Sequence, residues 1–290
     1  MAKVVIDFHT HILPPEIRDN RTQFIGRDPC FALLYDNPRA RVATVEDLIL
    51  SMDQAGVERS IILNIGWADH ELCLETNDYI LESISRYPDR LVGFCAIQPK
   101  AGQAALAEIR RCARGGIRGI GEMRPDLQGF DLGDEAVMRP LVEAAVEHRL
   151  VLLTHASEPV GHQYPGKGTV TPDMIYNFIC RFPDLRLVCA HWGGGLPFYA
   201  LMPEVGSALA NVWFDTAASP FLYRSQIFKH VIDMVGVDKI LFGTDYPLMA
   251  QQRPMSEIKA LQLTGEVEAM ILGDNAQRLL EALEGPLPER

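Results

Sequence analysis

Apolar runs of strand length alternate with amphipathic helical patterns along almost the whole chain, and this alternation limits the possible folds more than any other feature. Eight runs have strand character, and a helical pattern follows each of them. Residues 60–63, 151–153 and 187–189 are apolar almost throughout, as expected for parallel strands that are covered on both faces. We predict strands at residues 4–11, 59–65, 91–97, 117–123, 151–156, 187–191, 212–216 and 240–244.

The helical patterns between these strands have apolar residues at intervals of three and four. Thr44 followed by Glu46 and Asp47 indicates a capped helix start, and Gly56 indicates its end. We predict helices at residues 44–56, 72–87, 104–113, 135–148, 173–181, 198–209, 223–235, 254–261 and 267–284.

Eight β-α units in a chain of 290 residues predict a (β/α)8 TIM barrel. The runner-up is an open doubly wound sheet, but no Gly-x-Gly-x-x-Gly turn follows the first strand. No linker or change of composition divides residues 1–284, so we expect one barrel domain over this range. Residues 12–43, rich in Pro, Arg, Asn and Asp, are predicted to form a long loop that acts as a lid. Residues 285–290 are predicted to be a tail.

Charge and cysteine usage limit the partners and the compartment. The net charge of −11 is spread along the chain without a basic cluster, so nucleic acid is not an expected partner. The six cysteines show no Cys-x-x-Cys spacing, which favours reduced thiols and an intracellular compartment. No segment is long and apolar enough to span a membrane. We therefore expect a cytoplasmic protein whose partner is a small molecule rather than nucleic acid or a membrane, and a homodimer is the default oligomeric state.

Polar residues with metal-ligand chemistry end several predicted strands. In this type of barrel the carboxyl ends of the strands form the active site. On a strand, His9 and His11 point to the same side, where two imidazoles can bind one cation. Any one of these residues alone also fits a structural role, but their equivalent positions favour a shared metal site. The set is His9, His11, Glu122, His155, His191 and Asp245.

Four motifs in the expected order resemble the amidohydrolase superfamily. They are Asp7-Phe8-His9-Thr10-His11-Ile12-Leu13-Pro14, Ala190-His191-Trp192-Gly193-Gly194-Gly195, Gly243-Thr244-Asp245-Tyr246-Pro247 and Gly273-Asp274-Asn275-Ala276. Together they are similar to its amidohydrolase-2 branch, which contains the aminocarboxymuconate-semialdehyde decarboxylase type. The resemblance implies that His9, His11, His155 and Asp245 bind a divalent metal, usually zinc. It also implies that His191 is the acid/base or electrophile beside the metal.

Glu122 departs from the pattern of those decarboxylases, which have no metal-binding acid at the end of strand four. The Gly121-Glu122 element is instead similar to TatD-type hydrolases, in which a glutamate bridges two metals. In that case His155 and His191 become ligands of a second ion. The alternative is that Glu122 pairs with a neighbouring arginine, so the sequence leaves open whether one ion or two are bound.

Two reactions are consistent with this set of residues. Hydrolysis of an amide, ester or lactone-type bond uses a metal-activated water, with Asp245 taking its proton and His191 stabilising the oxyanion. The alternative is non-oxidative decarboxylation of a small cyclic or unsaturated acid, with His191 protonating the carbon that loses carbon dioxide. Glu122 suits a site that activates water, so hydrolysis is the main expectation, while the resemblance favours decarboxylation.

Further residues are candidates for substrate contacts. A decarboxylase needs a cation to hold a carboxylate, and Arg124, just past strand four, is the first candidate. His162 lies in the loop after strand five, which is expected to extend over the mouth of the barrel. Trp67 and Trp192 follow strands two and six, where they would either form an apolar wall for a ring-shaped substrate or only pack.

Overall fold

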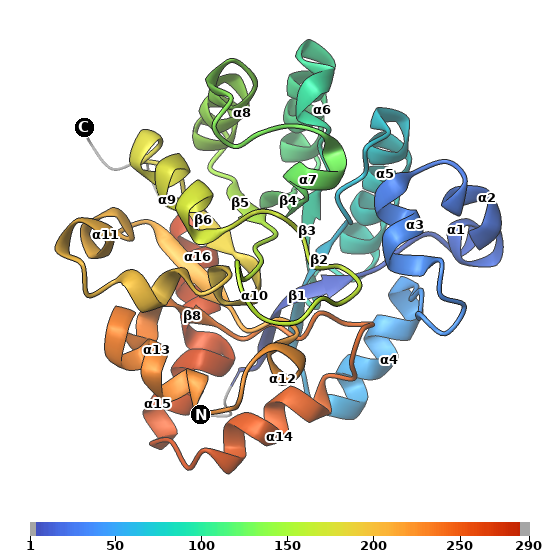
Figure 1. Cartoon of the computed structure of the whole chain (residues 1–290). Coiled ribbons are helices and arrows are strands. Elements are labelled where there is room, and N and C mark those ends of the chain that lie inside the picture. The colour runs from blue at the N-terminus through green and yellow to red at the C-terminus, as the bar shows by residue number, and fades with distance from the viewer. Residues whose placement is uncertain (1–3, 285–290) are drawn as a thin grey trace.

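The computed structural model describes residues 4–284, and over this range the chain forms a barrel of eight parallel strands. Each strand pairs with the next one in the sequence. In Figure 1 the strands lie at the centre and the helices surround them. The predicted (β/α)8 barrel is confirmed, and the predicted tail 285–290 lies outside the described residues. The strands are β1 (Ile6–His11), β2 (Arg59–Leu63), β3 (Leu91–Cys95), β4 (Gly119–Met123), β5 (Val151–Thr154), β6 (Leu187–Cys189), β7 (Val212–Asp215) and β8 (Ile240–Leu241).

The outer ring contains helices close to the predicted ranges. Thr44 and Asp47 form the predicted capping box of α4, and Gly56 ends the helix in the left-handed conformation. The predicted helix 198–209 is interrupted, because Pro203 starts a new helix. The main helices are α4 (Val45–Ala55), α5 (His70–Arg86), α6 (Gln103–Arg114), α8 (Glu135–Glu147), α9 (Pro172–Arg181), α11 (Pro203–Ala208), α13 (Ile227–Val235), α14 (Gln252–Ala260) and α16 (Asn275–Glu284).

Shorter helical segments occupy the connections between these elements. They are α7 (Pro125–Gln128), α10 (Ala190–Gly193), α12 (Ser219–Leu222), α15 (Gly265–Ala269), η1 (Pro99–Ala101), η2 (Leu196–Tyr199), η3 (Val237–Lys239) and η4 (Met270–Asp274). Among residues 4–284, no helix combines the length and the apolarity that crossing a membrane requires.

Apolar side chains from most of the strands fill the barrel. Phe8 of β1 packs edge to face on Phe94 of β3, with ring centroids 5.9 Å apart. The same cluster includes Leu279 and Leu283 of α16, so this helix closes the amino end of the barrel. Polar groups are therefore concentrated at the opposite end, where the strands finish.

The barrel closes where the segment after β8 runs beside β1. Three backbone hydrogen bonds join these segments, from the amides of Phe8, Asp245 and His11 to the carbonyls of Phe242, His9 and Tyr246, at 2.7, 2.9 and 2.7 Å. The metal-ligand candidates of β1 and of the segment after β8 are thus placed side by side by the closure itself.

The buried carboxylate of Asp7 holds the closing seam together. Its Oδ1 accepts hydrogen bonds from the backbone amides of His9 and Thr244 at 3.2 and 3.0 Å. Its Oδ2 accepts from Thr244 Oγ1 at 2.6 Å and from Gln251 Nε2 at 2.7 Å. Because four donors converge on two oxygens, this position requires a group that only accepts.

The segment 12–43 is not the irregular loop that its composition suggests. It contains α1 (Pro15–Asp19), α2 (Arg21–Ile25) and α3 (Pro29–Tyr35). A proline is the first residue of α1 and of α3. Its missing N–H costs nothing there, because the first N–H groups of a helix have no partner within the helix. The prolines that were interpreted as loop signals therefore begin helices. The segment has its own apolar cluster, in which Phe31 of α3 stacks on Trp67. That the segment acts as a lid stays a prediction.

We expect Asp7→Asn to lower the free energy of unfolding by about 2–4 kcal/mol, because the amide nitrogen would face buried donors and leave them unsatisfied. Urea denaturation followed by circular dichroism measures this change. The matched control is Asp53→Asn, which alters an exposed residue paired with Arg90 and should cost less than about 1 kcal/mol. Equal stability of the two variants would show that Asp7 does not secure the seam.

Candidate metal centre

All six residues predicted as metal ligands meet at the carboxyl ends of the strands. His9 and His11 end β1, and Glu122 lies in β4. His155 follows β5, His191 follows β6, and Asp245 follows β8. Ring or carboxylate atoms of these residues approach one another within 4 Å in a chain of contacts.

The first group of donor atoms comes from the seam between β8 and β1. The Nε2 atoms of His9 and His11 lie 3.0 Å apart. Asp245 Oδ1 lies 3.3 Å from the Nε2 of His11 and 3.8 Å from that of His9. Glu122 Oε2 lies 3.9 Å from His11 Nε2. Two imidazole nitrogens and two carboxylate oxygens thus face one small volume, as ligands of a divalent cation do.

The second group shares Glu122 with the first. Glu122 Oε1 lies 2.8 Å from His155 Nδ1 and 3.5 Å from His191 Nε2. The donor atoms of Glu122, His155 and His191 lie within 4.8 Å of one another. The same holds for the group His9, His11 and Glu122. The contact that the sequence left open is therefore with histidines, while Arg124 pairs with Asp126 instead.

The carboxylates of the centre are held in the ionised form. Burial would raise the pKa of Asp245, but the hydrogen bond with His11 and the charges of His9 and His191 lower it to about 2. Burial would likewise raise the pKa of Glu122, but the charge and hydrogen bond of His155 hold it well below its usual value. Both side chains are therefore available as anionic ligands at neutral pH.

The histidines differ in how strongly they hold a proton. Burial and the charge of Arg124 lower the pKa of His155 to about 4. For His9, burial would lower the pKa, but the charge and hydrogen bond of Asp215 raise it to about 10. For His191, burial would lower the pKa, but the hydrogen bond with Glu122 and the charge of Asp245 raise it.

Asp215, at the end of β7, completes the centre but was absent from the sequence prediction. Its Oδ2 lies 2.8 Å from His9 Nδ1, and both side chains are fully buried. Its Oδ1 accepts hydrogen bonds from the backbone amides of His191 and Ala217 at 2.9 and 3.0 Å. This contact orients His9 so that Nε2 faces the centre. The sequence contains a signal for Asp215, because this residue lies at the carboxyl end of a predicted strand, as the other candidates do.

The turn after β6 presents the ring of His191. His191 and Trp192 both adopt left-handed backbone conformations, with φ of 55° and 59°. His191 Nδ1 lies 3.1 Å from the carbonyl of Ala217, so an Nδ1–H donates there and Nε2 faces Glu122. Non-glycine residues in this conformation are strained, and such strain is concentrated at functional sites.

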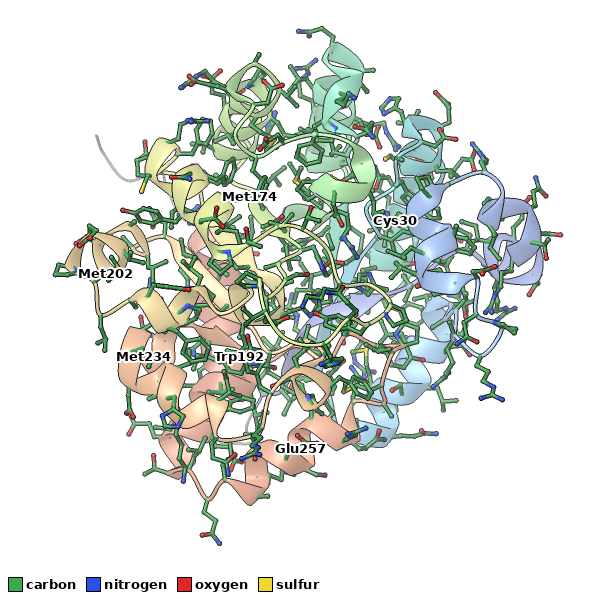
Figure 2. The ribbon with its side chains drawn as sticks, in the orientation of Figure 1. Cys30, Met174, Trp192, Met202, Met234 and Glu257 are labelled. Atoms are coloured by element: carbon green, nitrogen blue, oxygen red, sulfur yellow. The ribbon has the colours of Figure 1, made fainter. Side chains whose placement is uncertain are left out.

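The two tryptophans proposed as a pocket wall both pack on aromatic neighbours, and their contact with substrate stays a prediction. Trp192 packs on Phe228 of α13 and donates through Nε1 to Ser219 Oγ at 2.9 Å. Figure 2 shows it on the side of α12 and α13, away from the centre of the barrel. Trp67 is fully buried against Phe31. The Nε1–H of Trp67 is buried and has no hydrogen-bond partner among the described residues.

Arg124 lies beside the donor groups, and His162 lies in the exposed part of the loop after β5. Arg124 is only 2% exposed, and its Nε and Nη2 donate to Asp126 at 3.3 and 3.2 Å. A Cβ atom on Gly168 would lie 3.2 Å from Arg124 Nη2 and 3.1 Å from His155 Cδ2, so this guanidinium is beside the donor groups. His162 is exposed and borders a pocket of about 280 Å³, and its role as a substrate contact stays a prediction.

The loop after β5 extends over the mouth of the barrel, as predicted. Ser157 Oγ accepts a hydrogen bond from the Gly168 amide at 2.9 Å and lies 3.1 Å from His155 Nε2. A Cβ atom on Gly166 would be in van der Waals contact with Leu34 of α3 at 3.8 Å. In Figure 1 this loop crosses in front of the strands toward α3. The centre is therefore covered by two segments that meet above it.

Comparison with known proteins agrees with the fold and the motifs. The amidohydrolase family model matches residues 6–282. The chain is 23% identical to the 2-amino-3-carboxymuconate-6-semialdehyde decarboxylase of Dictyostelium discoideum, over 72% of this chain and 66% of that protein. It is 24% identical to the L-fucono-1,5-lactonase of Burkholderia ambifaria, over 70% of this chain and 69% of that protein. It thus spans about two thirds of the length of each relative.

Solved structures show the same fold at lower identity. The 5-carboxyvanillate decarboxylase of Novosphingobium aromaticivorans, solved with manganese and 4-hydroxy-3-methoxy-5-nitrobenzoic acid, superposes with a TM-score of 0.81 at 19% identity. The superposition covers 97% of this chain and 96% of that one. With the family match over nearly the whole sequence, the protein belongs to the amidohydrolase family, in its amidohydrolase-2 branch.

Proposed function

We propose that this enzyme is a metal-dependent, non-oxidative decarboxylase of a small cyclic or unsaturated carboxylic acid. The observation that carries the proposal is the buried guanidinium of Arg124 beside His155. Its Nε and Nη2 already donate to Asp126, so a substrate carboxylate would accept from the remaining N–H groups of the guanidinium. The charge of arginine persists when the side chain is buried. Hydrolysis of a neutral amide or ester requires no such cation next to the donor groups.

The relatives support the same choice. Most of those found act as decarboxylases, including several that act on gamma-resorcylate. The solved structures include decarboxylases of 5-carboxyvanillate and 2,6-dihydroxybenzoate. Hydrolysis, the main expectation from the sequence, is supported less well than its alternative, decarboxylation.

The donor set fits a divalent cation. His9, His11, His155 and Asp245 would hold the ion, with Glu122 as a further ligand. Bound there, the cation would act as a Lewis acid that orients and polarises oxygens of the substrate. The contact of Asp215 with His9 Nδ1 is the arrangement usual for a metal-binding histidine. Nitrogen and carboxylate ligands suit zinc, the expected metal, and also manganese.

His191 is positioned to supply the proton. Its raised pKa favours the imidazolium form, in which Nδ1–H donates to Ala217 and Nε2–H points toward Glu122. In decarboxylation the bond between the substrate carbon and its carboxylate breaks, and the electron pair stays on that carbon. His191 Nε2–H would then deliver its proton to this carbon as carbon dioxide leaves.

Lactone hydrolysis is the second candidate, and two observations favour it. One is the lactonase among the relatives. The other is the contact of Glu122 with both donor groups, which suits a site that activates water. In that reaction Asp245 would take the proton of the water.

An assay of two reactions tests the proposed function. We expect the metal-loaded enzyme to release carbon dioxide from at least one acid in a panel of 2,6-dihydroxybenzoate, 5-carboxyvanillate and unsaturated amino-carboxy acids. We expect His191→Ala to lower kcat by about 10²–10⁴ because the proton donor is lost. Carbon dioxide release is measured directly, and metal content is measured in parallel to show that the ion is retained.

The control for this assay is His230→Ala, which alters an exposed residue of α13 and should leave kcat unchanged. L-fucono-1,5-lactone is assayed beside the acids. Hydrolysis of the lactone without carbon dioxide release from any acid would replace the proposal with the second candidate.

Asp215→Asn should weaken metal binding about 10- to 100-fold. Asparagine has one side-chain oxygen, which cannot replace both carboxylate oxygens of Asp215. One of these oxygens faces His9 Nδ1, and the other accepts from the backbone amides of His191 and Ala217. Competition with a chromophoric chelator measures the dissociation constant for zinc and for manganese. The control Asp238→Asn, at an exposed site before β8, should keep the affinity of the parent enzyme. An unchanged affinity in Asp215→Asn would mean that Asp215 does not orient a metal ligand.

The number of metal ions bound per chain tests whether Glu122 bridges two ions. If Glu122 bridges two ions, the parent enzyme should contain two per chain and Glu122→Ala should contain one or none. His9→Ala combined with His11→Ala should lose the ion of the seam, because two of its nitrogen ligands are removed. Elemental analysis of purified protein gives these counts. One ion per chain in both the parent and Glu122→Ala excludes a bridging role.

A further inference from the structure

The ring of His155 presents one edge to the metal centre and another to the loop after β5 (residues 155–171). Its Nδ1 lies 2.8 Å from Glu122 Oε1, on the side of the donor groups. Its Nε2 lies 3.1 Å from Ser157 Oγ. The adjacent Cδ2 would lie 3.1 Å from a Cβ atom on Gly168. A cation held together with Glu122 would therefore be bound through Nδ1, and the loop covers the edge formed by Nε2 and Cδ2.

Ser157 fastens the base of this loop. The residue is fully buried. Its backbone amide donates to the carbonyl of Val170 at 2.8 Å, and its Oγ accepts from the amide of Gly168 at 2.9 Å. Residues 158–169 therefore leave the barrel and return to it at one point. The hydroxyl of Ser157 contacts both the returning backbone and the ring of His155.

Gly168 shows how closely the loop packs on the centre. Besides its contact with His155, a Cβ atom at this position would lie 2.8 Å from Asp126 Oδ2 and 3.2 Å from Arg124 Nη2. Carbon and oxygen atoms without a bond between them do not pack at 2.8 Å, so the loop or the ion pair of Arg124 with Asp126 would have to shift. The hydrogen bond to Ser157 thus fixes Gly168 directly against groups of the centre.

The hydroxyl of Ser157 suits the hydrogen-bonding state that metal binding imposes on His155. A neutral imidazole has one N–H group and one nitrogen with a free lone pair. When Nδ1 binds a cation, the proton is on Nε2, and this Nε2–H can donate to Ser157 Oγ. A hydroxyl oxygen has two lone pairs, so Oγ can accept from His155 and from Gly168 at the same time. Metal-binding histidines are usually oriented by such a partner on their second ring nitrogen.

We propose that Ser157 is a positioning residue, whose hydroxyl orients His155 for metal binding through Nδ1 and couples metal binding to the packing of the loop after β5 on the centre. The inference rests on metal binding by His155, which is part of the proposed function, and it applies to decarboxylation and lactone hydrolysis alike. Coupling of this kind is reciprocal. A bound cation should therefore hold Gly168 in place, and loss of the hydroxyl should weaken both metal binding and the attachment of the loop.

The metal affinity of Ser157→Ala tests the role of the hydroxyl. The substitution keeps a small side chain but removes the acceptor for the Nε2–H of His155. We expect the dissociation constants for zinc and manganese, measured on the full-length protein by chelator competition, to rise about tenfold. The matched control is Ser83→Ala, which removes a similarly buried hydroxyl that donates to the carbonyl of Tyr79 at 2.7 Å within α5. This control should bind both metals as the parent does, and melting temperatures are compared for all variants.

Hydrogen exchange at the Gly168 amide tests the coupling in the parent enzyme, without any variant. Addition of zinc or manganese should slow this exchange by about tenfold, the factor by which the hydroxyl favours the metal. In Ser157→Ala the exchange should be fast and should not respond to metal. The amide of Gly133 is the internal control, because it also donates to a side-chain oxygen, Asp131 Oδ1, at 2.7 Å, in the connection before α8. Its exchange should be the same with and without metal.

Each outcome bears on a different part of the inference. Unchanged metal affinity in Ser157→Ala would reduce Ser157 to an anchor of the loop and overturn its role toward the metal. Exchange at Gly168 that ignores metal in the parent would refute the coupling. Failure of the parent to bind zinc or manganese would contradict the metal-dependent function, and this inference with it. A metal-loaded parent that is active, together with normal metal affinity in Ser157→Ala, would contradict this inference alone.

Discussion

The seam between β8 and β1 is the interaction on which the rest of the site depends. His9 and His11 lie on one side of it and Asp245 on the other, so their donor atoms converge only when the barrel is closed. Asp7 holds the closure through four hydrogen bonds that cross from one segment to the other or fix the local backbone. Folding and assembly of the centre are therefore one event, because the contacts that finish the barrel also place the ligands.

Buried charge is the second constraint on this end of the barrel. Desolvation opposes every ionised group there, and each carboxylate is offset by nearby imidazoles or backbone amides. Glu122 contacts both histidine groups, while Asp215 contacts His9 and the backbone of His191. The balance differs between two histidines of the site: Asp215 outweighs burial and raises the pKa of His9, whereas burial and the charge of Arg124 outweigh Glu122 and lower the pKa of His155.

The fold and the six candidate ligands were predictable from the sequence because both follow from local periodicity and from one rule about strand ends. Asp7 and Asp215 were missed for different reasons. Asp7 has partners more than 230 positions away, which no local pattern reveals, whereas Asp215 satisfies the strand-end rule and was overlooked. The helices of segment 12–43 were missed because proline and aspartate begin short helices as well as loops. The packing of Trp192 against Ser219 and Phe228 depends on the left-handed turn after β6, which no local pattern indicates.

The helix α16 gives the molecule a property that the site alone does not show. Its leucines join the apolar filling of the barrel at the amino end. The donor groups lie at the opposite ends of the strands, on the side where α3 and the loop after β5 meet. We expect a substrate to reach the donor groups from that side, because packed side chains fill the interior behind them.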